Sequence, residues 1–389
     1  MLVQDRKEFV EVCQAIRNER AFAWDTEFIQ DRTYWPKLCV VQVATRDLVA
    51  AIDPFAVGDL DPLWELVVDP EVLVVLHAGA QDLQIAYDAT KRVARNVFDT
   101  QIAASFVGYG DSISYAGLLA RELGVRLSKK ETMTDWSRRP LTSEQLEYAL
   151  DDVRHLLTVY DRLRKRLEEL GRLGWMEEEH RAFQDEDGFR RDPRNAWKRL
   201  SKRKALDRKS LAVLREVAAW RETAASERDV PRNRIVTDEI LVEISRRAPK
   251  KTENLSAIRS LTERAVQQHG AQILEAVARG LAVSPDDRPE PPPLRSEDPA
   301  RARVVDLMDL LVQIRSRETG IGRNVMATRL DLDRFLAGHL GQDDDGEPPR
   351  IAHGWRFELV GGDLVRLLEG NIDLGIDPKE MVPRVTRHT

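Results

Sequence analysis

The sequence predicts an N-terminal α/β domain with a mixed sheet, followed by helical units. Residues 1–167 alternate short apolar, β-rich runs with helical patterns, as is typical of an α/β domain. Beyond Arg162, apolar residues recur at helical spacing only. Residues 284–299 are rich in proline and acid. They can neither pack a core nor continue a helix, which indicates an exposed linker between two helical units.

The first domain contains four runs with the composition of strands and five segments with helical spacing. The helical segments lie between and after the strands, so they are expected to cover the sheet. The predicted strands are Ala21–Trp24, Pro36–Ala44, Leu48–Ile52 and Glu71–Leu76. The predicted helices are Lys7–Asn18, Gln81–Ala89, Gln101–Val107, Tyr115–Leu123 and Ser143–Leu167.

The helical region contains one strongly basic stretch. Residues 190–209 carry ten Lys or Arg against two Asp, ahead of helical units at 207–284 and 299–378. Such a stretch is suited to contact a nucleic-acid backbone, with Arg199 and Lys202 as candidate contacts. A solvated charged helix would have the same composition, and both interpretations stay open.

Composition narrows the class of protein. The net charge of −6 argues against a nucleic-acid partner only if the charge is evenly spread. Two cysteines, Cys13 and Cys39, lack the spacing of a disulfide framework or a zinc site. No apolar run approaches the ~18 residues of a membrane span, and neither a signal peptide nor an ATP-binding phosphate loop is visible. We expect a soluble, cytoplasmic monomer.

Two acidic residues follow the first apolar strand. In a strand, residues i and i+2 point to the same face, so Asp25 and Glu27 are expected side by side, about 7 Å apart at their Cα atoms. Like charges so placed repel unless a cation neutralises them. Hard oxygen ligands suit Mg²⁺ or Mn²⁺. A solvated strand end would show the same pattern.

Two further segments bring acids to the ends of elements. Asp82 lies in the first turn of the helix that follows the strand ending near His77. Its carboxylate could simply complement the helix dipole. His77 is expected to be a structural residue. Tyr148 and Asp152 are four residues apart, so they share one helix face, whereas Asp151 is turned away by ~100°.

The combination points to one chemistry. Four carboxylates and a tyrosine provide what two-metal phosphodiester hydrolysis needs: one cation generates hydroxide and the other stabilises the leaving 3′ oxygen. No Ser-His-Asp arrangement, nucleophile elbow or cysteine nucleophile competes for this role. The candidate catalytic residues are Asp25, Glu27, Asp82, Tyr148 and Asp152.

The order DTEF…LHAGAQDL…YALDD resembles the DEDD exonucleases whose third motif carries a tyrosine. The wider text is similar to ribonuclease D over most of residues 20–160. It includes YWPKLCVVQVA, FDTQIAA, the LSKK segment that ends at Lys130, and DWSRRPLTSEQLEYALDDV; outside this range, HGWRFEL also resembles that family.

The resemblance implies a ribonuclease H-like exonuclease domain at 1–167, with a five-stranded mixed sheet and flanking helices. It also implies that Asp25, Glu27, Asp82 and Asp152 bind two Mg²⁺ or Mn²⁺ ions and that Tyr148 orients water. Phe28 would stack on the terminal base, and Lys130 joins Arg199 and Lys202 as a candidate RNA contact. We expect Asp99 to cap the helix that follows it.

Residues 207–284 resemble the HRDC domain, a small helical module that usually assists nucleic-acid binding. Residues 299–378 are expected to be a divergent second copy, with Trp355 and Phe357 in its core. The implied function is metal-dependent 3′→5′ exoribonuclease activity that releases nucleoside 5′-monophosphates in tRNA 3′ processing. A 3′→5′ DNA exonuclease and a catalytically inactive nucleic-acid-binding protein are the alternatives. The intact acidic residues argue against the inactive binding protein, whereas the candidate metal ligands do not distinguish RNA from DNA.

Overall fold

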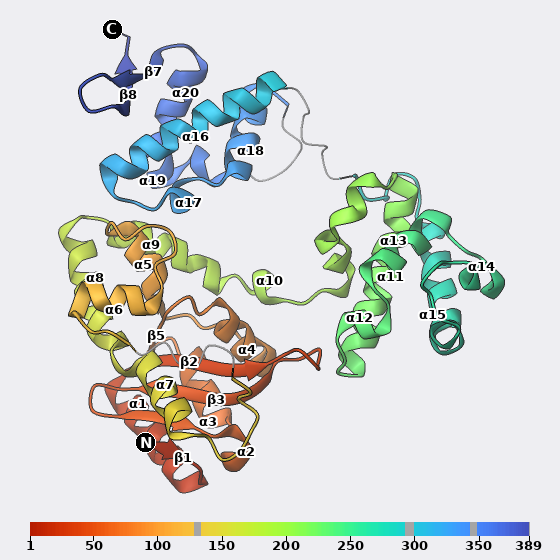
Figure 1. Ribbon diagram of the computed structural model, residues 1–389, viewed down its shortest axis with the longest axis horizontal. Coiled ribbons are helices and arrows are strands. Elements are labelled where there is room, and N and C mark those ends of the chain that lie inside the picture. Colours follow the sequence, from red (N-terminus) through yellow and green to blue (C-terminus); the bar gives the residue numbers. More distant parts are fainter. Residues whose placement is uncertain (128–133, 292–298, 343–347, 389) are drawn as a thin grey trace. The chain divides into compact units, whose positions relative to one another are not determined.

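The computed structural model describes residues 1–127, 134–291, 299–342 and 348–388. The chain divides into two compact units (Figure 1). The first combines Met1–Glu27, Cys39–Phe189 and the C-terminal region from residue 298, and the second combines Phe28–Leu38 with Arg190–Glu297. Across the described ranges, no helix is long and apolar enough to span a membrane.

The first unit contains a mixed sheet of strand order β1-β4-β3-β2-β5-β6. Strand β2 pairs in parallel with β5, whereas β3 and β4 are antiparallel. The mixed sheet is confirmed, but it has six strands rather than five. The strands are β1 Leu2–Val3, β2 Ala21–Ile29, β3 Lys37–Ala44, β4 Val49–Ile52, β5 Leu73–Leu76 and β6 Val97–Asp99.

Helices cover this sheet largely where their spacing predicted them. Asp5 caps α1, and Thr142 with Gln145 forms a capping box that starts α7. The single helix expected over Ser143–Leu167 is interrupted at His155, so that α7 packs against β4 while α8 packs against β5 and α5. These helices are α1 Arg6–Glu19, α2 Pro54–Val57, α3 Asp61–Val68, α4 Ala80–Thr90, α5 Thr100–Phe106, α6 Tyr115–Leu123, α7 Ser143–Arg154 and α8 Leu156–Glu169.

The C-terminal region shares its hydrophobic core with the nuclease part of the first unit. Trp355 is buried as expected; its ring stacks on Trp175 with 5.5 Å between centroids and meets the edge of Phe106 at 5.3 Å. The expectation that Phe357 is a core residue is wrong, since it is 40% exposed. The C-terminal region therefore packs as part of the first unit.

The C-terminal region is helical up to a final hairpin. The strands β7 Ile372–Asp377 and β8 Val382–Arg387 pair antiparallel, so an all-helical description is wrong there, and the fold continues beyond residue 378. The preceding elements are α9 Leu173–His180, η1 Arg181–Gln184, α10 Glu186–Phe189, α16 Pro299–Thr319, α17 Arg323–Met326, α18 Arg329–His339, η4 Arg350–Ala352, α19 Gly354–Arg356, η5 Phe357–Gly361 and α20 Gly362–Leu368.

The second unit is built on the close packing of two long helices, α11 and α15. The basic stretch at 190–209 forms two short 3-10 helices rather than one long charged helix. Its apolar residues Trp197, Leu200 and Leu206 are buried in the core of this unit. The elements are η2 Pro193–Arg199, η3 Ser201–Ala205, α11 Arg208–Glu227, α12 Arg232–Ile235, α13 Asp238–Arg247, α14 Thr252–Ser256 and α15 Glu263–Ala282.

The packing of α15 on α11 depends on Gly280. A Cβ atom there would lie 2.5 Å from the Cα of Val213 and 2.9 Å from the carbonyl oxygen of Ala212, both backbone atoms of α11. We therefore expect Gly280→Ala to lower the free energy of unfolding by ~1–3 kcal/mol, measured by chemical denaturation. Gly174→Ala in α9 is the matched control, since nothing lies within 4 Å of its Cβ. Equal stability of the two variants would contradict this packing.

Candidate active site

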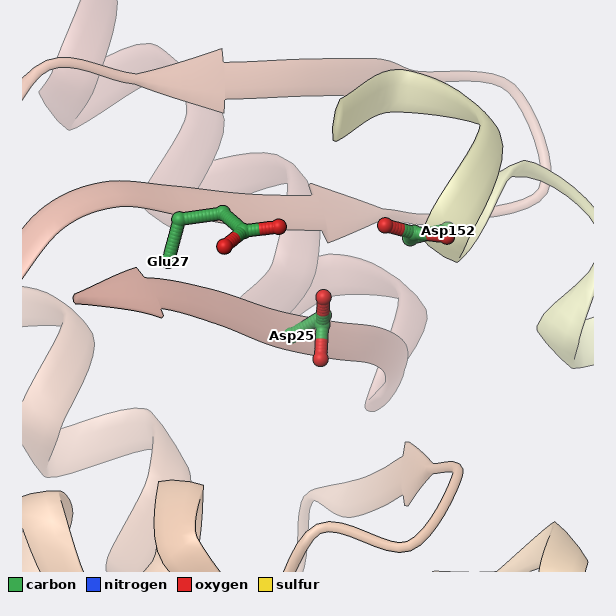
Figure 2. A group of neighbouring side chains, drawn as sticks. All are labelled: Asp25, Glu27 and Asp152. Atoms are coloured by element: carbon green, nitrogen blue, oxygen red, sulfur yellow. The ribbon is translucent and has the colours of Figure 1, made fainter. Parts of the chain in front are cut away.

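Three carboxylates from two elements converge beside the sheet. Asp25 and Glu27 come from β2 and Asp152 from α7, and Figure 2 shows the three side chains gathered together. One oxygen of each lies within 4.8 Å of the others. The two β2 acids share a face because side chains alternate along a strand. They lie inside the strand rather than at its end, because β2 extends to Ile29.

Asp82 lies in the first turn of α4 and is 7% exposed. Its carboxylate accepts a hydrogen bond from the hydroxyl of Thr26, the residue between the two β2 acids. Asp82 is not one of the three converging carboxylates, although its charge contributes to raising the pKa of Asp25. The structure therefore brings three of the four predicted acids together and places the fourth beside them.

The turn that leads into α4 is held by Asp99. This carboxylate accepts hydrogen bonds from the backbone amides of Ala78 and Gly79, at 3.1 and 3.0 Å. It also accepts from the amide of Gln101, at 2.8 Å, which confirms that Asp99 caps α5. Asp99 thereby connects the start of α5 to the turn before Asp82.

The carboxylates are electrostatically unfavourable as they stand. Burial, reinforced by the neighbouring acids, raises the pKa of Asp25 well above its usual range and that of Glu27 to about 8. Burial and then the charge of Asp151 raise the pKa of Asp152 to about 7. Among the residues that the structure describes, the charges that contribute most to these three shifts are those of other acids. Such a set favours either protons or a bound cation.

Tyr148 lies one turn before Asp152 on α7, and its phenol is hydrogen-bonded to that carboxylate. Burial and the charges of the surrounding acids, Asp152 first among them, raise the pKa of the phenol, so it keeps its proton at neutral pH. The Trp136 ring lies 6.0 Å from the Tyr148 ring, centroid to centroid. The helix thus presents a protonated phenol to the acidic site.

The segment before α7 is fastened to the sheet by Arg139. Its guanidinium donates to both carboxylate oxygens of Asp53, at 2.7 and 2.8 Å, and to the carbonyl oxygen of Cys39, at 2.7 Å. Arg139 lies in the motif DWSRRP, for which the sequence predicted no role of its own. A bidentate Arg–carboxylate pair fixes both distance and orientation, so this contact helps to hold the start of α7 in place.

A second tyrosine near the acids was not predicted. Tyr115 on α6 is close enough that, after burial, the charge of Asp152 is the next cause of its raised pKa. Its ring contacts His77, whose ring nitrogens lie 2.9 Å from the Thr100 hydroxyl and 3.1 Å from the Ile113 carbonyl oxygen. His77 is therefore held as a structural residue, as expected.

The remaining candidates are dispersed. Phe28 is half-buried near the end of β2. Arg199 ends η2 and lines a cavity of about 410 Å³ in the second unit. Asp151 pairs with Arg154, consistent with its expected orientation away from the site. Lys130 and the side chain of Lys202 lie outside the described part of the chain.

Two known protein families match this chain. A 3′–5′ exonuclease family matches residues 1–168, which include all the candidate acids. The HRDC domain family matches residues 210–277, within the second unit. One HRDC match is found, so the expected count of two HRDC domains is not supported.

Whole-chain relatives point the same way. Ribonuclease D of Nitrobacter hamburgensis is 39% identical over 388 residues and 99% of both chains. Ribonuclease D of Sphingobium indicum is 38% identical over 383 residues and 96% of both chains. The crystal structure of Escherichia coli RNase D, described as an exoribonuclease involved in structured RNA processing, superimposes with a TM-score of 0.83 at 30% identity. That alignment covers 95% of this chain and 98% of the other.

The pKa shifts of the acidic site predict how stability depends on pH when no metal is bound. The folded protein retains protons on Glu27 and Asp152 that the unfolded chain has already released, so raising the pH through the window from about 4 to about 8 favours unfolding. Added Mn²⁺ is expected to restore stability, most strongly near pH 8, where its ligands are deprotonated.

The measurement is thermal unfolding of chelator-treated protein at several pH values, with and without Mn²⁺. His180 has the opposite effect on the pH dependence of stability. Burial lowers its pKa in the folded protein to about 4, so between that pH and its ordinary pKa the side chain gains a proton only on unfolding. The comparison is therefore made with Asp152→Asn, which leaves His180 unchanged. Identical pH profiles for the two proteins would show that Asp152 does not carry this proton.

Proposed function

The chain belongs to the ribonuclease D family and is a 3′→5′ exoribonuclease, and we propose that it uses two divalent cations to release nucleoside 5′-monophosphates from RNA 3′ ends. The observation that carries the metal assignment is the convergence of three carboxylate oxygens within 4.8 Å. Asp82 supplies the fourth acid of the site, next to Thr26.

The chemistry of the donors fits divalent metal. The ligands are carboxylate oxygens on a strand and two helices, which suits Mg²⁺ or Mn²⁺ rather than a softer ion. Their raised pKa values reflect burial together with the charges of neighbouring acids. When bound, the cations would activate water and stabilise the leaving 3′ oxygen.

The protein's own groups would orient the reactants. The Tyr148 phenol, protonated and fixed by Asp152, can donate a hydrogen bond to the attacking water or to the scissile phosphate. Phe28, just after Glu27 on β2, offers an aromatic face to the terminal base. Neither group supplies charge, so both are assigned to positioning.

Structured RNA is the proposed substrate class, with tRNA precursors as the leading case. Two observations support it: similarity over nearly the whole chain to an exoribonuclease described as acting in structured RNA processing, and an HRDC unit directly behind the nuclease. A preference for DNA is the alternative, since carboxylates at the scissile phosphate do not distinguish ribose from deoxyribose. The three converging carboxylates, with Asp82 beside Thr26, argue against an inactive binding protein.

The deciding experiment offers matched RNA and DNA oligomers, labelled at the 3′ end, to the purified protein with Mg²⁺ or Mn²⁺. We expect labelled nucleoside 5′-monophosphate to appear from RNA first and to disappear with excess chelator. Asp25→Asn and Asp152→Asn should each lower turnover by several orders of magnitude while RNA binding persists, because each removes a ligand charge but keeps the shape.

Three results would contradict these assignments. Full activity in excess chelator would rule out the metal. Faster release from DNA would favour the alternative substrate. A variant with more than about a tenth of the wild-type rate would show that its position is not a metal ligand, since two-metal chemistry implies a far larger loss.

Tyr148→Phe tests the role of the phenol. It should lower the turnover number by ~10²–10⁴-fold, the usual contribution of a group that assists proton transfer or positions water. Binding of Mn²⁺, followed by calorimetry, should remain near wild type because no carboxylate is lost. Tyr115→Phe on α6 is the matched control, since that phenol is assigned no part in the reaction. Unchanged turnover of Tyr148→Phe in saturating RNA would reduce Tyr148 to a packing residue.

A further inference from the structure

The text YWP, which follows the acidic strand, has no role in the proposed chemistry. It lies in the segment Phe28–Leu38, which comprises the end of β2, the connection after it and the start of β3, and which we call the connector hairpin. This segment packs with the HRDC-containing unit rather than with the sheet that it extends. Tyr34 is 3% exposed and belongs to the hydrophobic core of that unit.

Tyr34 is held through its side chain. Its hydroxyl donates a hydrogen bond of 2.6 Å to Glu222 on α11. The same carboxylate receives two hydrogen bonds from Arg232, at 2.6 and 2.7 Å, and the Arg232 guanidinium lies 4.7 Å from the centre of the Tyr34 ring. The phenol thus contacts a partly buried ion pair, and charge-assisted hydrogen bonds of this kind are the strong ones.

The hairpin backbone is held as well. One carboxylate oxygen of Asp229 accepts hydrogen bonds from the amides of Tyr34 and Trp35, both at 3.0 Å. The Trp35 indole donates to the carbonyl oxygen of Ser226, at 3.3 Å. Side chains and backbone together fix the hairpin tip against the end of α11.

The covalent path from this anchor to the acidic site is short. Glu27 is the last residue of β2 that belongs to the sheet-containing unit, and Phe28 is the first that belongs to the other. Glu27, a proposed metal ligand, is thus one peptide bond from this segment and seven peptide bonds from the anchored Tyr34. Catalytic groups tolerate little displacement, since ~1 Å can cost about 10²-fold in rate.

We propose that Tyr34 and Trp35 are positioning residues: anchored by Glu222, Asp229 and Arg232, they hold the end of β2 so that Glu27 and Phe28 keep their places in the acidic site. This inference rests on the proposed function for the identity of the site. It gives the HRDC-containing unit a second task besides any contact with RNA. A substrate too short to reach that unit would still depend on the anchor.

Asp229 offers the sharpest test. It is exposed and has a φ of 48°, in the left-handed region that favours glycine. Asp229→Gly therefore removes the acceptor for both amides without backbone strain. Asp229→Asn is the matched control, because asparagine tolerates the same backbone conformation and keeps an acceptor oxygen.

Three measurements are made on the full-length chain. Trypsin cleavage after Arg32, an exposed hairpin residue, reports release of the hairpin. Calorimetry reports Mn²⁺ affinity, and turnover of a diribonucleotide reports the reaction. For Asp229→Gly we expect several-fold faster cleavage, weaker Mn²⁺ binding and a turnover number at least about tenfold lower, with Asp229→Asn near wild type on all three.

Two outcomes would overturn the proposal. Wild-type Mn²⁺ affinity and turnover despite faster cleavage would show that the anchor does not position the site, and unchanged cleavage would show that Asp229 does not hold the hairpin. If Asp229→Gly fails to fold, Tyr34→Phe, which deletes only the hydroxyl bonded to Glu222, is judged by the same criteria. A wild-type protein inactive on the diribonucleotide would count against the proposed function, while the cleavage and Mn²⁺ measurements would still decide on the anchor.

Discussion

Repulsion among half-buried carboxylates is the constraint around which the first unit is organised. One oxygen each of Asp25, Glu27 and Asp152 lies within 4.8 Å of the others. Burial first, and then the charges of neighbouring acids, raise the pKa of all three. A fold selected for stability alone would not retain such an arrangement, because each buried charge costs free energy unless it is paired. A bound divalent cation would offset that cost, and this explains why the three carboxylates can lie so close together.

The surrounding structure compensates by holding the elements rigidly. Asp99 joins the turn before α4 to the start of α5. Arg139 fastens the segment before α7 to the sheet through Asp53. Each of the two residues fixes an element that carries a proposed metal ligand, Asp82 in the first case and Asp152 in the second. Preorganised ligands of this kind need little rearrangement to accept a cation.

The two helical parts of the chain differ in whether they share the hydrophobic core of the nuclease. The C-terminal region contributes Trp355 to the core that contains Phe106, so it packs as part of the same unit. The HRDC-containing unit has its own core, into which the connector hairpin inserts Tyr34. Strand β2 therefore contributes residues to both units, and Glu27 is its last residue in the first unit.

The sequence by itself predicted the mixed α/β domain, a helical module at 207–284 and the candidate acids, because strand and helix periodicities and short motifs are local properties of the chain. The HRDC family match at 210–277 lies within that module. It did not predict the two short edge strands, β1 and β6, whose pairing with β4 and β5 defines them. The 3-10 form of the basic stretch, the sharing of the C-terminal core and the capture of Tyr34 were decided by tertiary structure. Each depends on contacts between residues far apart in the chain, such as Tyr34 with Glu222, and no local pattern encodes such a partner.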